Sequence, residues 1–570
     1  MAIRWVHTNT PPKNQLFPEP LRRALLHAGA TMAPDDAGKI VTVTLPGRPA
    51  VAVDTRRGCL AWTPTEIRRH AREMAISCLR ERKVLRDPWL GLQPTAETPE
   101  GAFLRAADPR WWRRNLERAI RIHQEEAARR LGLVGKGGRS YAGPCAAEWY
   151  DHRERATADF LSRYVVYDHV SGNSVPIAKV AKDAEARAAE IYATLKAVEA
   201  LANRDGLGWA MLTITLPGPW HANPGNGTKS WNGKDARAAH QEIALGWKGF
   251  HDTLRNNGLR LTGVRVEEPM EDGTPHWHAL ILYRDSRDLT LTQQAIMKHW
   301  PAGLKVRSSR NTAAGKLRFD VRVYDTPADV AAGRYHRNRR RGAQCQLDVG
   351  NAQVSSMASY VIKYASKTVG YAMGGNKSPS HPSPSARAVQ EHRQTYGIHA
   401  LQFYGLPRGW KFAWNALRRI RPEDQPSPAL QSLANLAQQP KGAGMVGLLD
   451  YLGSLAISRP QGAAFPRIEP EKLPRTNRYS EPSAKTIGIR LVDAAGRPVE
   501  VLGFNAGDRE IMSAEAAQGI QTLPADSERL VVGNGYRVHF GQPGQISGPI
   551  WANSVLHEKN LMVQEGAPAP

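Results

Sequence analysis

Hydrophobic and polar residues repeat with two different periods along this chain, and the period changes near residue 205. From about residue 64 to 203 the apolar residues recur every three or four positions, as in WWRRNLERAIRIHQEEAARRLGLV, which indicates amphipathic helices. At GWAMLTITLPG, residues 208–218, the period becomes two, which is typical of a strand. Alternation around Pro-Gly in KIVTVTLPGRPAVAVDT, residues 39–55, predicts a hairpin.

These patterns divide the chain into five expected segments. After residue 205 a helix, DARAAHQEIALGWKGFHDTLRNNG, is followed by strands LRLTGVRVEEP and HWHALILY, which indicates an α+β domain with helices flanking antiparallel strands. Eight prolines between residues 422 and 474 predict a linker with one short helix at GMVGLLDYLGSLA. The segments are a leader with a small hairpin (1–63), a helical domain (64–204), the α+β domain (205–421), the linker (422–474) and a β-rich module (475–570).

The charge of the chain favours a polyanionic partner. Its 570 residues include 77 Lys and Arg against 53 Asp and Glu, a formal net charge of +24, which favours binding to nucleic acid. Residues 301–341 concentrate this charge, with eleven Lys or Arg against three Asp. They end in a cluster expected to contact DNA phosphates, unless it is a basic loop without a partner: Arg337, Arg339, Arg340 and Arg341. With no apolar leader and no long apolar run, we expect a cytoplasmic protein without a membrane partner.

TPHWHALIL, residues 274–282, places two histidines at alternate positions of a predicted strand. His276 and His278 would therefore project from the same face. The turn PMEDGTP would fold the preceding strand back and bring Glu268 to that face, whereas Glu267 would point away into solvent. Two imidazoles and one carboxylate leave coordination positions open, which favours Mg²⁺ or Mn²⁺ at a reactive site over a closed structural zinc site. The alternative is a solvated strand face with incidental histidines.

A second candidate site lies in MASYVIKYASKTVG, residues 357–370, which has helical periodicity. Tyr360, Lys363, Tyr364 and Lys367 share one face of this helix, and Lys367 is expected to contact DNA. A phenol becomes a good nucleophile when a neighbouring ammonium favours its anion, so Lys363 could activate a tyrosine or hold a phosphate. The opposite face is expected to pack on the sheet and to turn the phenols outward: Ala358, Val361, Ile362 and Ala365. The alternative is a helix whose tyrosines only cover the core.

Together these motifs resemble the phage replication gene A proteins, rolling-circle initiators of the HUH endonuclease class. MLTITLP is similar to the first motif of that family, RVEEPMEDGTPHWHALIL to its metal motif and YVIKY to its two-tyrosine motif, in the same order. Flanking segments are also similar, and the resemblance covers about residues 75–485: DPRWWRR, YGIHALQFYG through WNALRRIR, and RTNRYSEP.

The resemblance implies an HUH-type antiparallel sheet that carries a divalent ion on Glu268, His276 and His278. It implies that Tyr360 and Tyr364 are the nucleophiles and that Lys363 assists at the phosphate. A tyrosine would attack a metal-bound phosphate of supercoiled or single-stranded origin DNA, leaving a 5′-phosphotyrosine link and a free 3′-hydroxyl for host polymerase. The second tyrosine would allow strand rejoining after one round. Because no GxxxxGK[ST] element occurs, a host helicase would separate the strands.

Two alternatives remain open at this point. One is a single-tyrosine relaxase or transposase, in which one of the two phenols is structural. The other is a non-catalytic DNA-binding regulator with incidental histidines.

Overall fold

The computed structural model covers most of the chain up to residue 503 and four short stretches beyond it. The described ranges are 16–35, 39–55, 59–169, 172–181, 184–225, 230–311, 317–337, 342–350, 356–368, 384–399, 401–421, 424–439, 442–503, 509–514, 529–532, 536–540 and 546–547. The chain forms two compact units, one of residues 1–150 and 184–501 and one of residues 151–183 and 502–570. Within the described ranges, no helix is long and apolar enough to cross a membrane.

A seven-stranded sheet in the first unit has the strand order β10-β9-β11-β6-β8-β7-β12. Its strands are β6 (Gly208–Ile214), β7 (Gly263–Pro269), β8 (Pro275–Tyr283), β9 (Leu304–Asn311), β10 (Leu317–Tyr324), β11 (Cys345–Val349) and β12 (Leu401–Tyr404). Neighbouring strands run antiparallel except β9 and β11, which are parallel. The α+β class is thus confirmed, but the expectation of a wholly antiparallel sheet is wrong. The chain between β9 and β11 includes β10 and α10 (Pro327–Ala332), and so is long enough for a parallel return.

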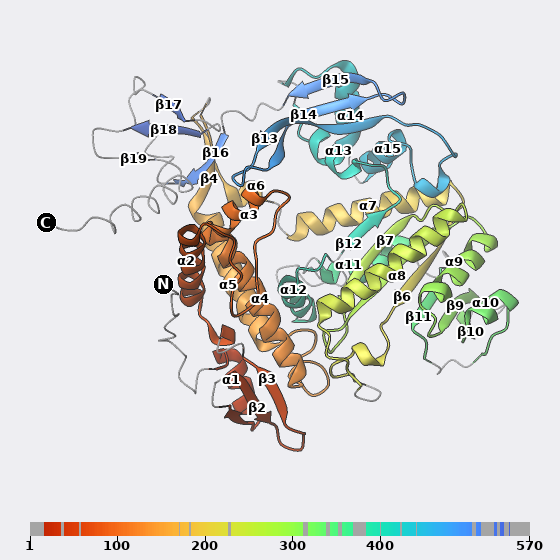
Figure 1. Ribbon diagram of the computed structural model, residues 1–570. Helices are drawn as coiled ribbons and strands as arrows, with labels where there is room; N and C mark the ends of the chain where they lie inside the picture. Colours follow the sequence, from red (N-terminus) through yellow and green to blue (C-terminus); the bar gives the residue numbers. More distant parts are fainter. Residues whose placement is uncertain are drawn as a thin grey trace. The chain divides into compact units, whose positions relative to one another are not determined.

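Helices cover this sheet because each presents an apolar stripe to it. On one face, α8 (Ala236–Asn256) and α9 (Ser286–His299) contact β8. Figure 1 shows α8 lying along the strands of this sheet. The buried positions of α8 recur at helical spacing, and the Asp235 side chain caps its first turn by accepting from the Ala238 N–H. On the other face, α11 (Met357–Thr368) contacts β7, and α7 (Ala184–Arg204) and α12 (Pro384–Tyr396) pack against α11.

The N-terminal region contains the predicted hairpin and helices, with additions. Strands β2 (Ile40–Thr44) and β3 (Val51–Asp54) pair antiparallel as expected, and β1 (Thr31–Pro34) extends them. Two short strands, β4 (Tyr164–Asp168) and β5 (Ser174–Pro176), interrupt the segment expected to be helical. The remaining elements are α1 (Glu19–His27), η2 (Cys59–Ala61), α2 (Pro64–Glu81), α3 (Pro99–Ala106), α4 (Pro109–Arg130), α5 (Pro144–Arg163), α6 (Ile177–Val180) and, before α8, η3 (Gly218–Trp220).

The segment expected to be a Pro-rich linker is folded instead. It contains α14 (Pro428–Ala437), α15 (Ala443–Tyr451) and η5 (Ala456–Ser458), and α13 (Trp410–Leu417) precedes it. Of these, α15 is the one short helix that was expected in this segment. Most of its leucines are buried, including Leu433 and Leu448. The proline content did not exclude helices here, because Pro428 occupies the first turn of α14, where a missing N–H costs nothing.

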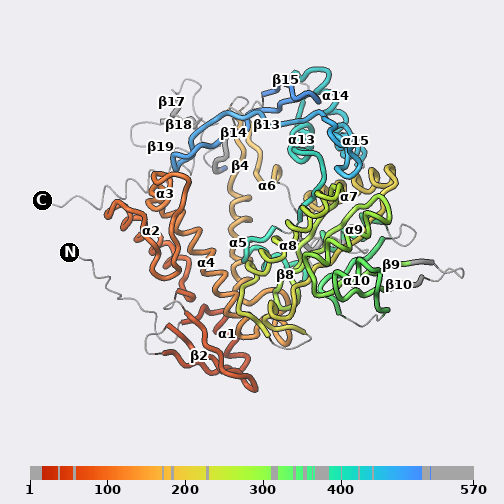
Figure 2. The backbone as a smooth tube through the Cα atoms, turned by 45° about the vertical axis from the view of Figure 1, so that its right-hand side comes forward, coloured from red at the N-terminus to blue at the C-terminus, as the bar shows by residue number. Residues whose placement is uncertain are grey.

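The C-terminal segment is rich in strands, but these belong to both units. The sheet of β13 (Arg467–Thr476), β14 (Pro482–Val492) and β15 (Pro498–Gly503) lies largely in the first unit, and β13 and β14 run side by side along their lengths (Figures 1 and 2). In the second unit, β16 (Arg509–Ser513) pairs with β4, which lies far earlier in the chain. A further three-stranded sheet there consists of β17 (Arg529–Val532), β18 (Tyr536–Phe540) and β19 (Ile546–Ser547).

Candidate metal and nucleophile site

The two candidate histidines lie at the start of β8, in the middle of the sheet. The turn from β7 to β8 passes through Gly273 at φ 77°, a conformation that favours glycine. The resulting register places Glu268 of β7 directly opposite His276. His278 lies two residues further on and therefore shares that face. We call this side of the sheet the ligand face.

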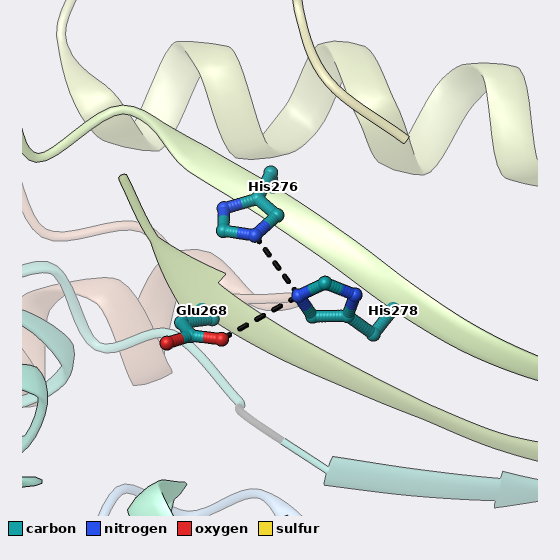
Figure 3. A group of neighbouring side chains, drawn as sticks. All are labelled: Glu268, His276 and His278. Carbon is teal, nitrogen blue, oxygen red and sulfur yellow. Dashed lines mark hydrogen bonds and ion pairs between the residues drawn. The ribbon is translucent and has the colours of Figure 1, made fainter. Parts of the chain in front are cut away.

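The three polar groups converge in space (Figure 3). The Nε2 atoms of His276 and His278 are 2.9 Å apart, and the Nε2 atom of His278 is 3.4 Å from Oε2 of Glu268. Ligand atoms of all three residues lie within 4.8 Å of one another. This is the one cluster of three or more potential metal-binding side chains found in the described ranges.

This donor set fits a divalent ion. With metal–ligand bonds of about 2.1 Å, adjacent ligands of an octahedral ion lie about 3.0 Å apart, close to the separation of the two imidazole nitrogens. Nδ1 of His278 is 3.0 Å from the hydroxyl of Thr213 on β6. If Nε2 of His278 is a ligand, Nδ1 carries the proton and donates a hydrogen bond to the hydroxyl oxygen of Thr213, which orients the ring.

Glu267 does not point into solvent, so the expectation that its side chain is solvated was wrong. Its side chain is 2% exposed, on the face opposite the ligands. Trp277, its cross-strand neighbour, lies beneath α8 and contacts His240 and Trp247. Burial raises the pKa of Glu267 to about 8; Arg393 opposes this shift, and Glu268 adds to it. The covered face excludes Glu267 from the donor set.

Helix α11 carries both tyrosines to the ligand face. The ring of Tyr364 stacks on that of His278 with centroids 3.9 Å apart. Tyr360, one turn earlier, lies 6.1 Å from Tyr364 between ring centroids and contacts Trp209 of β6. The N-terminus of α11 is held by Glu199 of α7, which accepts a hydrogen bond from the Ala358 N–H.

The orientation of this helix differs from the one expected. Ala358, Val361 and Ala365 are fully buried, but Ile362 is only partly so. The phenols lie over the sheet rather than turning away from it, because α7 and α12 also pack against α11 and bury apolar surface away from the sheet.

Tyr360 also contacts a carboxylate that the sequence patterns did not single out. Its hydroxyl donates to Oδ2 of Asp348 on β11 at 3.1 Å. Burial, followed by the charge of Asp348 and the neighbouring Tyr364, raises the pKa of Tyr360 well above its ordinary value. The period-two pattern that placed His278 also places Asp348 and Thr213 on this face, but only the strand order shows that these residues are neighbours.

The remaining candidate residues are only partly described. Lys363 and Lys367 lie on α11, but their side chains fall outside the described part of the structure, as do Arg339, Arg340 and Arg341. Arg337 is exposed, and its guanidinium lies over the ring of Tyr335. The basic stretch before it forms the β9–β10 hairpin and α10 within the described ranges.

The chain matches the model of the bacteriophage replication gene A protein (GPA) family over residues 83–371. It is 24% identical to the replication protein of Haemophilus phage HP1 over 69% of this chain and 47% of that protein. It is 26% identical to the replication gene A protein of Escherichia phage 186, over 53% of this chain and 41% of that protein.

A third relative is the "Probable replication endonuclease from prophage-like region" of Salmonella typhimurium, 25% identical over 54% of this chain and 35% of that protein. The chain thus spans about half or less of the length of these curated relatives. No solved structure matches it.

Proposed function

Because this chain belongs to the bacteriophage replication gene A protein family, we propose that it is an HUH-type endonuclease that nicks DNA to initiate rolling-circle replication. The observation that carries the proposal is the stacking of Tyr364 on His278 at 3.9 Å. It joins a pair of phenols to a cluster of metal-binding side chains, although about eighty-five residues separate the two motifs. One relative is named a probable replication endonuclease, which supports the same activity.

We assign the donor residues as follows. Glu268, His276 and His278 would hold Mg²⁺ or Mn²⁺, and Thr213 would keep His278 in the tautomer that exposes Nε2. When bound, the ion would withdraw negative charge from the scissile phosphate.

The two tyrosines would perform the covalent chemistry. A phenol oxygen forms a bond to phosphorus while the bond to the 3′-oxygen breaks, so that DNA remains attached through a 5′-phosphotyrosine. The energy of the phosphodiester is retained, and a 3′-hydroxyl can later attack the adduct and reseal the strand. The ring centroids of the two tyrosines are 6.1 Å apart, so one tyrosine can hold the first adduct while the other cleaves the regenerated origin.

The DNA partner is supported by charge, with a formal net of +24 over the chain. Supercoiled or single-stranded origin DNA would be the substrate. Host polymerase would extend the 3′ end, and a host helicase would unwind the strand, in the bacterial cytoplasm.

The proposal is tested by trapping the covalent adduct. The full chain is incubated with Mn²⁺ and a random pool of 3′-labelled single-stranded oligonucleotides, and adducts that resist SDS are recovered and sequenced. We expect adducts with one preferred sequence, which EDTA prevents and which are absent from the double variant Tyr360→Phe/Tyr364→Phe. Recovered sites are then placed in supercoiled plasmid to test nicking.

The outcomes separate the alternatives. If one single variant loses the adducts as completely as the double variant does, and the other single variant retains them, the protein is a single-tyrosine relaxase or transposase. Tight DNA binding without any adduct indicates a regulator. Cleavage that survives the double variant refutes tyrosine attack.

A further inference from the structure

We propose that Asp348 is a catalytic proton acceptor for Tyr360, and that it makes the two tyrosines chemically unequal. The inference rests on the proposed function, because it assigns a role in tyrosine attack. It is drawn from a hydrogen-bonded chain, Arg307–Asp348–Tyr360, that runs across the ligand face of the sheet.

The strand register explains how these groups meet. On β11, Asp348 is paired with Met211 of β6 and with Arg307 of β9. Met211 and Thr213 alternate with buried residues of the other face, and Thr213 is paired with His278. Asp348 therefore shares the ligand face with His278, two strands away.

The carboxylate of Asp348 is held in one orientation by an ion pair and several hydrogen bonds. Nε of Arg307 lies 2.8 Å from Oδ1, and Nη2 lies 3.4 Å from Oδ2. The side-chain amide of Gln346 donates to both oxygens, at 3.0 and 3.2 Å. The Tyr360 hydroxyl donates to Oδ2 at 3.1 Å. The side chain of Asp348 is only 15% exposed, so these contacts are partly shielded from water.

A base at this position meets a need of the proposed chemistry. Tyr360 does not ionise readily where it lies, since burial, Asp348 and Tyr364 raise its pKa. A nucleophile that stays protonated must lose its proton as it attacks, and a carboxylate already at hydrogen-bond distance can accept it. The Tyr360 oxygen bonds to phosphorus, the phosphorus–3′-oxygen bond breaks, Asp348 takes the phenol proton, and the departing 3′-oxygen takes a proton from solvent.

Tyr364 has different surroundings. Its ring stacks on His278, beside the proposed metal ligands, rather than on the strand that carries Asp348. Among the described side chains, the charged and titratable groups that face Asp348 are Arg307 from β9 and Tyr360 from α11, with Tyr364 next to Tyr360. Loss of the Asp348 carboxylate should therefore affect attack by Tyr360 far more than attack by Tyr364.

The test measures each tyrosine separately. Tyr364→Phe leaves Tyr360 as the nucleophile, and Tyr360→Phe leaves Tyr364; Asp348→Asn is added to each in the full chain. Using the adduct-forming oligonucleotide and Mn²⁺, we expect Asp348→Asn to slow adduct formation through Tyr360 by about 10²-fold at pH 7, the usual contribution of a general base. Through Tyr364 the change should be less than about threefold, well below that contribution.

The pH profile distinguishes a base from a structural group. With Asp348 present, the rate through Tyr360 should depend only weakly on pH from neutral pH upward, whereas in the Asp348→Asn variant the rate should keep rising with pH as phenolate forms. Asp348→Glu should restore part of the rate. As a matched control, Asp320→Asn removes an Asp that pairs with Arg322 on β10, and should not change the Tyr360 profile.

Equal losses through both tyrosines, an unchanged profile, or adducts through Tyr364 but none through Tyr360 would overturn the role of Asp348 while leaving the nicking activity intact. Absence of any adduct in the unmodified chain would instead overturn the proposed function itself.

Discussion

The two faces of the β7–β8 pair differ more than their sequences suggest. On the ligand face, Glu268 and His278 converge beneath Tyr364. On the opposite face, Glu267 and Trp277 are buried, and Trp277 contacts Trp247 of α8. Adjacent residues in the sequence therefore have opposite roles, one set reaching a reactive surface and the other filling the core.

This difference shows that the pKa and the role of a carboxylate depend on which face of the sheet it occupies and on what covers that face. Glu267 and Glu268 are chemically identical neighbours, yet burial against packed helices raises the pKa of one, and the other meets two imidazoles. A shift of register by one residue would exchange their environments and dismantle both faces at once.

The largest effect on the free energy of unfolding should come from truncating a buried side chain on the covered face. Trp277 is 2% exposed, so Trp277→Ala should lower the free energy of unfolding by about 3–5 kcal/mol, through lost burial and the cavity left behind. Differential scanning calorimetry of the full chain measures the change. His276→Ala, one residue away on the partly exposed ligand face, is the control and should cost less than about 1 kcal/mol. Similar losses in both variants would contradict the distinction between the faces.

Breaking the ligand face should instead remove metal binding. His278→Ala should weaken the binding of Mn²⁺ by at least about 10²-fold, since even indirect supports of metal ligands contribute 10- to 100-fold. Isothermal titration calorimetry of the full chain without DNA makes the readout independent of cleavage. Glu267→Gln should bind the ion like the unmodified chain, and a parallel loss there would place the site on the wrong face.

The pH dependence of stability should sharpen the contrast between the two glutamates. The pKa of Glu267 is about 8 in the folded chain and about 4.5 in the unfolded chain, so its stabilising contribution is complete below about pH 4.5 and is lost as pH rises towards 8. The slope would be about 1.4 kcal/mol per pH unit at its steepest.

Urea unfolding at a series of pH values measures this slope. Glu267→Gln should remove the contribution of this residue to the slope, because the amide does not titrate. Glu268→Gln should retain most of it, because burial is the largest cause of the raised pKa and the charge of Glu268 only adds to it. Identical slopes in the Glu267→Gln variant and the unmodified chain would contradict the assignment.

The smallest effect should come from the hydroxyl that orients His278. Thr213→Val preserves the shape of the side chain but removes the partner of Nδ1 at 3.0 Å. We expect about a tenfold loss of Mn²⁺ affinity, the lower end of the range for such supporting contacts. Thr213→Ser retains the hydroxyl and is the matched control; a loss as large in Thr213→Ser would point to packing rather than hydrogen bonding.

Local patterns predicted much of the chain. The alternation around His276 and His278 was enough to place both imidazoles on one strand face, and helical spacing was enough to group Tyr360 with Tyr364, because both periods follow from backbone geometry. The hairpin near residue 45, helix α8 and the turn that returns Glu268 were predicted for the same reason.

What the tertiary structure alone decided is how elements distant in sequence meet. Strand order brings Asp348 of β11 beside Arg307 and within reach of Tyr360. Tertiary packing on the opposite face buries Glu267, which the sequence pattern had assigned to solvent. The Pro-rich segment folds because most of its leucines are buried in a core. Strands β9 and β11 can run parallel because the connection between them is long enough to bring the chain back to the same end of the sheet. A periodic sequence determines which side chains share a face, but pairing and burial depend on residues far along the chain, whose positions no local period encodes.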